Sequence, residues 1–70
     1  LFDTVMVSAN DELVRMYLNG KINYKDIVKK LIKIVNLKEF VKFKKKIPKK
    51  ILDIVNLDRY VRLKINTKGV

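Results

Sequence analysis

Few side chains in this sequence could carry chemistry. It contains no histidine and no cysteine, so the nucleophile–base pairs of most hydrolases cannot be assembled from it. The remaining candidates are Ser8, two threonines, the lysines and seven carboxylates spread along the chain. Ser8 is interpreted as a helix cap rather than a nucleophile, and scattered acids form a hard-metal site only if the fold assembles them. The sequence therefore predicts no catalytic, cofactor-binding or metal-binding residue, and this chain alone is not expected to be an enzyme.

Two further features could be mistaken for a catalytic or phosphate-binding site. Asp11 and Glu12 are adjacent acids, but on a helix neighbouring side chains point about 100° apart. We therefore interpret them as negative charge at the positive end of a helix dipole. The two glycines do not form a phosphate loop or a dinucleotide-binding fingerprint.

The net charge of +10 favours an anionic partner. Between Lys38 and Lys50 there are seven lysines and one acid, with Phe40 and Phe43 in the run and Tyr60 further on, a pattern that could bind and stack on nucleic acid. Against this, Phe40 falls on the apolar spacing and the run has no arginine. Part of the charge is explained by a composition rich in Lys, Asn and Ile, the residues that AT-rich coding sequences supply.

The length of 70 residues predicts one small domain, residues 1–70, which buries only about 60% of its unfolded surface. Without cysteine or histidine it has no disulfide or zinc site to stabilise it. No apolar run approaches the roughly 18 residues of a membrane span, so no membrane partner is expected. Because the chain starts with Leu1 rather than Met, we expect a piece of a larger protein.

The first predicted helix follows residues 1–7, which are interpreted as an extended lead-in or equally as the end of a linker from an upstream domain. Ser8 is the expected N-cap, with Asp11 three residues later as in a capping box. Apolar side chains then recur on one face, and Gly20 supplies the left-handed residue that ends the helix. That face contains Ala9, Leu13, Met16 and Tyr17, widened by Val14 and Leu18.

The second predicted helix begins at Asn23, where Asp26 repeats the capping pattern. One of its faces is apolar and the other is lysine-rich. Because the loop is short, the two helices are expected to form an antiparallel hairpin. The apolar face contains Ile27, Val28, Leu31, Ile34 and Val35.

The remaining chain is harder to assign. Residues 36–47 could form a helical turn that passes into a lysine-rich connector, residues 37–47, or a short strand over residues 41–44; the turn is preferred. Pro48 suits the first turn of a final segment that is either one long helix or two short ones joined near Asn56. Asp58 and Arg62 can pair at i, i+4 spacing for about 0.3 kcal/mol. Residues 64–70 are expected to be a frayed tail.

Two ungapped segments resemble the C-terminal helical domain of 1-deoxy-D-xylulose 5-phosphate (DXP) reductoisomerases. The family pattern TVxNAANEVAVxAFLxGKIxFxDI is matched by Thr4-Val5, Ala9-Asn10-Asp11, residues 17–22, Tyr24 and Asp26-Ile27. The pattern PxSLEDILEADRWAR is matched by Pro48 and residues 51–62, ILDIVNLDRYVR. The sequence departs from the family at Val7, where the first Asn of NAANE is expected, at Glu12 and Arg15, and in its lysine content.

The resemblance implies an all-α fold, a small helical bundle of three to four short helices that supports a larger enzyme. Such an enzyme uses NADPH and Mg²⁺ or Mn²⁺ in the non-mevalonate isoprenoid pathway. Its reacting residues lie in upstream nucleotide-binding and catalytic domains, which would be the partners of this domain, with a homodimer of the parent as a further option. The implied location is the cytoplasm, or a plastid-type organelle in a eukaryote. The alternatives are a basic helical module that binds nucleic acid or another polyanion, and an unrelated adaptor bundle.

Overall fold

The computed structural model describes residues 1–68, and these residues form an all-α fold without a strand. The elements are α1 (Phe2–Leu18), α2 (Tyr24–Val35), α3 (Lys38–Val41), the 3-10 turn η1 (Lys42–Lys45) and α4 (Ile51–Lys68). The predicted fold class is confirmed. None of these helices is long and apolar enough to cross a membrane.

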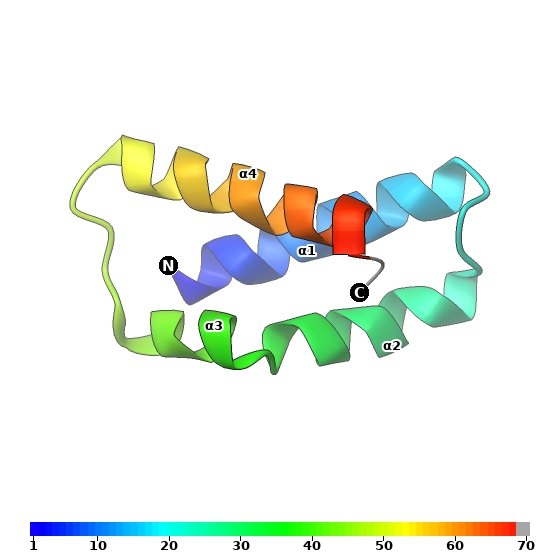
Figure 1. The fold of residues 1–70 in the computed structure, drawn as a ribbon, viewed down its shortest axis with the longest axis horizontal. Coiled ribbons are helices and arrows are strands. Elements are labelled where there is room, and N and C mark those ends of the chain that lie inside the picture. The colour runs from blue at the N-terminus through cyan, green and yellow to red at the C-terminus, as the bar shows by residue number, and fades with distance from the viewer. Residues whose placement is uncertain (69–70) are drawn as a thin grey trace.

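Helix α1 is the central element and packs against both α2 and α4 (Figure 1). Helix α2 runs antiparallel to α1, so the predicted hairpin is confirmed. The segment from α3 to residue 50 then returns the chain to the end of the bundle where α1 begins, and α4 therefore runs parallel to α1 (Figure 1). The core between these helices is apolar: Val5, Ala9, Leu13, Ile34, Phe40, Leu57, Val61 and Ile65.

The predicted start of the first helix was wrong. Residues 1–7 are not extended, because α1 already begins at Phe2. Val5 lies one turn before Ala9 on the same face, and both are fully buried, so core packing outweighs the weak helix propensity of the β-branched segment. Ser8 is consequently inside the helix and caps nothing. Asp11 and Glu12 are also too far along the helix to act on its dipole, a role left to Asp3 in the first turn.

The predicted end of this helix is confirmed. Gly20 has a φ of 75°, the left-handed conformation that glycine adopts without a Cβ clash. Its amide donates to the Tyr17 carbonyl at 3.0 Å, and the Lys21 amide donates to the Met16 carbonyl at 2.9 Å. These two bonds make a Schellman motif. Asn19, the residue before it, has an ordinary φ of −88°.

The start of α2 is also as predicted. Asn23 and Asp26 form a capping box, in which the backbone N–H of Asn23 donates to Asp26 Oδ2 at 3.0 Å. The predicted apolar face of this helix is only partly covered: Ile34 is buried, whereas Val28 is exposed.

The segment after α2 forms helical turns rather than a strand. Phe40, on α3, is buried, and its ring meets the Tyr60 ring of α4 edge-on with centroids 6.0 Å apart. The alternative prediction of a strand over residues 41–44 is therefore wrong: these residues lie in helical turns, next to buried Phe40. In η1, Lys44 is exposed and its Nζ lies 5.2 Å from the centre of the Phe2 ring.

The final segment is one continuous helix with no joint at Asn56. Pro48 precedes α4 instead of occupying its first turn, and Asp53 Oδ2 accepts the amides of Lys49 and Lys50 at 3.0 and 3.3 Å. The predicted frayed tail is helical as far as Lys68, because Ile65 is buried in the core. Residues 69–70 lie outside the described residues.

Candidate functional site: the polar network between the first and last helices

Five polar side chains meet where α1 packs against α4. Two of them, Ser8 and Glu12, lie one turn apart on α1 and are buried despite their polarity. The other three, Asp58, Arg62 and Asn66, lie at successive turns of α4. Because the two helices are parallel, the i, i+4 rows face each other in register. We call these five residues the α1–α4 polar network.

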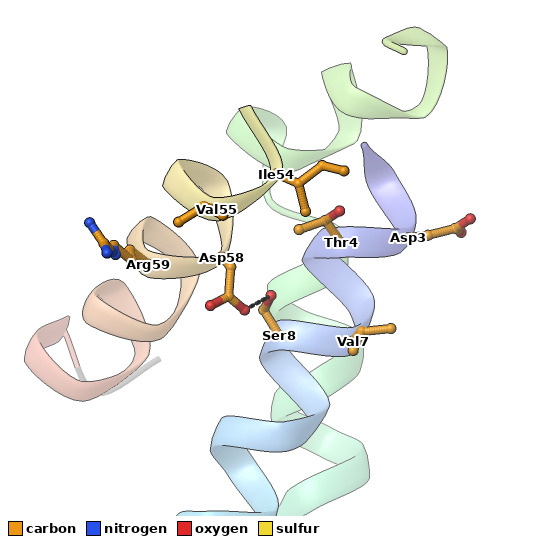
Figure 2. Close-up of a pocket in the computed structure, with 8 residues that line it drawn as sticks. All are labelled: Asp3, Thr4, Val7, Ser8, Ile54, Val55, Asp58 and Arg59. Carbon is orange, nitrogen blue, oxygen red and sulfur yellow. Dashed lines mark hydrogen bonds between the residues drawn. The ribbon is translucent and has the colours of Figure 1, made fainter. Parts of the chain in front are cut away.

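The first contact of the network joins a hydroxyl to a carboxylate. Ser8 Oγ donates to Asp58 Oδ1 at 2.5 Å, as Figure 2 shows. This bond, together with the nearby Arg62 guanidinium, holds the pKa of the Asp58 carboxyl below its ordinary value, even though partial burial acts in the opposite direction. Asp58 therefore stays ionised, and as a weak base it is poorly suited to activate the Ser8 hydroxyl.

The Arg62 guanidinium joins three carboxylates on two helices. Its Nε donates to Asp58 Oδ1 at 3.0 Å and its Nη1 to Glu12 Oε1 at 3.3 Å, while Nη2 lies 3.5 Å from Asp11 Oδ2. The pKa of Arg62 is raised, chiefly by the hydrogen bond to Asp58. The second oxygen of Glu12 accepts a hydrogen bond from Asn66 Nδ2.

The network is satisfied from within the chain. Glu12 is 2% exposed, and among the side chains of residues 1–67 no buried nitrogen or oxygen lacks a hydrogen-bond partner. No group of three His, Cys, Asp or Glu side chains in the same residues could hold a metal ion. The network's contacts between the two helices, Ser8 with Asp58 and Glu12 with Arg62 and Asn66, can fix the register of α4 on α1.

A groove of about 420 Å³ opens beside this network, at the end of the bundle where α1 and α4 begin. Its apolar wall comes from Val7 of α1 and from Ile54 and Val55 of α4. Asp3 and Arg59 point outward on opposite sides of it (Figure 2). Such a groove is suited to apolar groups rather than to a small charged substrate.

The sequence predicted one contact of the network, the Asp58–Arg62 pair, and the structure confirms it. The roles of Ser8, Glu12 and Asn66 were missed. A usable signal existed, since Ser8 and Glu12 lie next to the apolar stripe of α1, and Asn66 continues the i, i+4 row of Asp58 and Arg62. The partners across the interface could not be assigned without the parallel packing of the helices.

Comparison with known proteins gives the family. Residues 1–64 match the family described as DXP reductoisomerase C-terminal domain. The chain belongs to this family. A relative of the DXP reductoisomerase family, 1-deoxy-D-xylulose 5-phosphate reductoisomerase of Pelagibacter ubique (strain HTCC1062), is 53% identical over 70 residues. That alignment covers 100% of this chain and 18% of the relative. No solved structure matches the chain significantly.

The membership also shows how much of the relative lies outside this domain. A C-terminal domain of DXP reductoisomerase that spans 18% of a relative leaves most of that protein outside it. The resemblance deduced from the two sequence patterns is thereby confirmed, including the all-α bundle that it implied.

Proposed function

We propose that this chain is the supporting domain of a complete DXP reductoisomerase. The parent would convert 1-deoxy-D-xylulose 5-phosphate into 2-C-methyl-D-erythritol 4-phosphate with NADPH and Mg²⁺ or Mn²⁺, in the non-mevalonate isoprenoid pathway. The observation that carries this proposal is the 53% identity over the whole chain to an enzyme of that name. A cytoplasmic parent, which could form a homodimer, belongs to the same proposal.

The described residues do not fit NADPH or a divalent cation. The acids that lie closest together, Asp11, Glu12 and Asp58, already share the Arg62 guanidinium, which takes the place a cation would need. Gly20 ends a helix, whereas a phosphate-binding glycine precedes one. Both groups would therefore be bound by upstream nucleotide-binding and catalytic domains of the parent. The role proposed for residues 1–70 is to brace those domains.

The test uses the complete parent enzyme. The purified protein should oxidise NADPH only when both DXP and a divalent cation are added. In Arg62→Met, which breaks the polar network, the midpoint of thermal inactivation should fall while kcat at low temperature stays near the wild-type value. Arg59→Met, an exposed arginine on the same helix, is the matched control and should change neither quantity.

Two results would contradict this proposal. A folded parent that does not turn over DXP would overturn the assigned reaction. A large loss of kcat in Arg62→Met at a temperature where the protein remains folded would overturn the supporting role, because it would mean that the network acts on the reaction itself.

A second candidate, polyanion binding, is favoured by the exposure of six lysines within residues 42–50. The aromatic residues beside them are less suited to stacking on bases. Phe40 is buried, and the ring of Phe43 is already contacted by two lysines, with its centre 5.4 Å from Lys42 Nζ and 5.5 Å from Lys46 Nζ. Polyanion binding predicts a gel shift with RNA or DNA at about 50 mM salt that weakens steeply as salt is raised. Absence of a shift at the lower salt would exclude this function.

A further inference from the structure

Exposed apolar side chains occur along all the longer helices, and one set of them lies where α4 begins. At the start of α4, Ile51 and Ile54 are exposed, and Ile47 is exposed in the segment just before it. Val7 of α1 and Val55 of α4 line the groove beside them. We call these five residues the apolar end patch. Three of the five, Val7, Ile54 and Val55, line the same groove, and an apolar groove at the surface marks an interaction site.

The start of the chain lies at the same end. The Leu1 nitrogen donates to the Lys46 carbonyl at 2.9 Å, next to Ile47. If residue 1 is preceded by more chain, this nitrogen becomes a peptide amide that can donate to the same carbonyl. The preceding residues would then leave the bundle beside the groove, one turn from Asp3 and Thr4 in its lining.

The amount of chain outside this domain indicates what covers the patch. The chain spans 18% of its relative and belongs to a C-terminal domain family, so the larger part of such a protein precedes residue 1. A polypeptide joined at Leu1 is held at high effective concentration next to the patch, and a modest apolar contact is then enough to keep it docked.

The charge around the patch defines its partner further. Lys44, Lys45, Lys46, Lys49 and Lys50 lie in the same connecting segment as Ile47, and all five are exposed. Interfaces generally have an apolar centre and a polar rim, with complementary charge on the two sides. The matching surface is therefore apolar in the middle with acidic side chains around it.

We propose that the apolar end patch is the docking surface for the part of the parent polypeptide that precedes Leu1. This inference rests on the proposed function in one respect, that the parent has an upstream part. It adds which end of the domain makes the contact, and it leaves the exposed residues at the opposite end, such as Leu18, facing solvent.

The test measures cysteine labelling in the intact parent. This chain has no cysteine of its own, so single cysteines can be placed by Val7→Cys and Ile51→Cys. Each has a control of equal exposure in the domain: Val7 is 60% exposed and Leu63 62%, while Ile51 is 80% exposed and Leu18 75%. Maleimide labelling is followed peptide by peptide with mass spectrometry, and each rate is divided by the rate for the same site in urea.

Docking at the patch predicts that Val7→Cys and Ile51→Cys react about tenfold more slowly than Leu63→Cys and Leu18→Cys, because a thiol in a packed interface is shielded from the reagent. Equal rates within each pair would overturn the proposal. Slow labelling of Leu18→Cys with fast labelling of Ile51→Cys would also overturn it, since docking would then occur at the opposite end. NADPH-dependent turnover of DXP is measured on the same samples, so a failure of the proposed reaction is seen separately from a failure of the docking surface.

Discussion

Arg62 shows how one side chain can hold two helices in register. Its guanidinium contacts Glu12 and Asp11 on α1 as well as Asp58 on α4, and one of these carboxylates is almost completely buried. An exposed i, i+4 pair contributes little, because water screens it. The consequence of losing Arg62 is set instead by Glu12, whose buried carboxylate would be left with only the longer 3.9 Å contact to Arg15 Nη1.

We expect Arg62→Met to lower the free energy of unfolding by about 2 kcal/mol, since the buried Glu12 carboxylate loses its closest cation and keeps only exposed Arg15 at 3.9 Å, while Arg62 itself was partly screened. Urea denaturation of residues 1–70 followed by circular dichroism would measure this. Adding Glu12→Gln to Arg62→Met should recover about 1 kcal/mol by removing the unpaired charge. A loss below about 0.5 kcal/mol in Arg62→Met would contradict this account and would mean that Arg15 or solvent compensates Glu12 when Arg62 is absent.

The lowered pKa of Asp58 predicts a dependence of stability on pH. Between the folded pKa and the unfolded value of about 3.9, the unfolded state binds more protons than the folded state. The stabilisation is therefore complete above about pH 5 and is lost as the pH falls through the folded pKa. The urea midpoint of the wild type should decrease more between about pH 5 and about pH 3 than that of Asp58→Asn.

Ser8→Ala tests the origin of this shift. It removes the hydroxyl that is the largest cause of the lowered pKa and leaves Arg62 in place, so its pH dependence should lie between those of the wild type and Asp58→Asn. A pH dependence of the urea midpoint equal to that of the wild type would show that the nearby arginines, Arg62 and Arg59, set the pKa of Asp58 without the Ser8 hydroxyl.

At the scale of elements, the ends of the helices are fixed by local chemistry in some places and by packing in others. The Schellman motif at Gly20 and the capping box at Asn23 depend on residues that are close in sequence. The start of α1 depends instead on burial of Val5 beside Ala9, residues whose neighbours in the core come from distant segments. This difference explains why sequence patterns located the first two boundaries and misplaced the third.

Gly20→Ala should destabilise the domain by about 1 kcal/mol, because an L-residue is strained at the positive φ of this position. Nothing lies within 4 Å of the Cβ that alanine would add, so the cost comes from backbone strain alone. Gly20→Asn should cost less, and Asn19→Ala, at an ordinary φ, should have little effect. Urea midpoints that are equal for Gly20→Ala and Asn19→Ala would contradict this account of the helix end.

At the scale of the whole molecule, α3 and the chain after it close the bundle. The Phe40 ring packs edge-on against the Tyr60 ring of α4. On the same short helix, Glu39 forms an ion pair with Lys64, with Oε1 and Nζ 2.7 Å apart. These contacts place the return segment so that α4 starts at the same end as α1. The parallel packing of α1 and α4 in turn assembles both the polar network and the apolar end patch.

Phe40→Ala should lower the free energy of unfolding by about 3–4 kcal/mol, because it empties a site that is 1% exposed. Val41→Ala, at an exposed neighbouring position, should cost less than about 1 kcal/mol. The two variants can be compared by thermal unfolding. A Phe40→Ala domain that kept its stability but lost affinity for RNA would instead support the stacking role considered for this residue.

The sequence by itself determined the helical class, the family, the hairpin of the first two helices and the Asp58–Arg62 pair. Each of these depends on residues within a few turns of one another, or on a pattern in which such residues recur. Tertiary structure decided the start of α1, the continuity of α4 and the roles of Ser8, Glu12 and Asn66. Those features depend on contacts between residues about 50 positions apart, such as Ser8 with Asp58, and short-range periodicity does not specify which helix faces which.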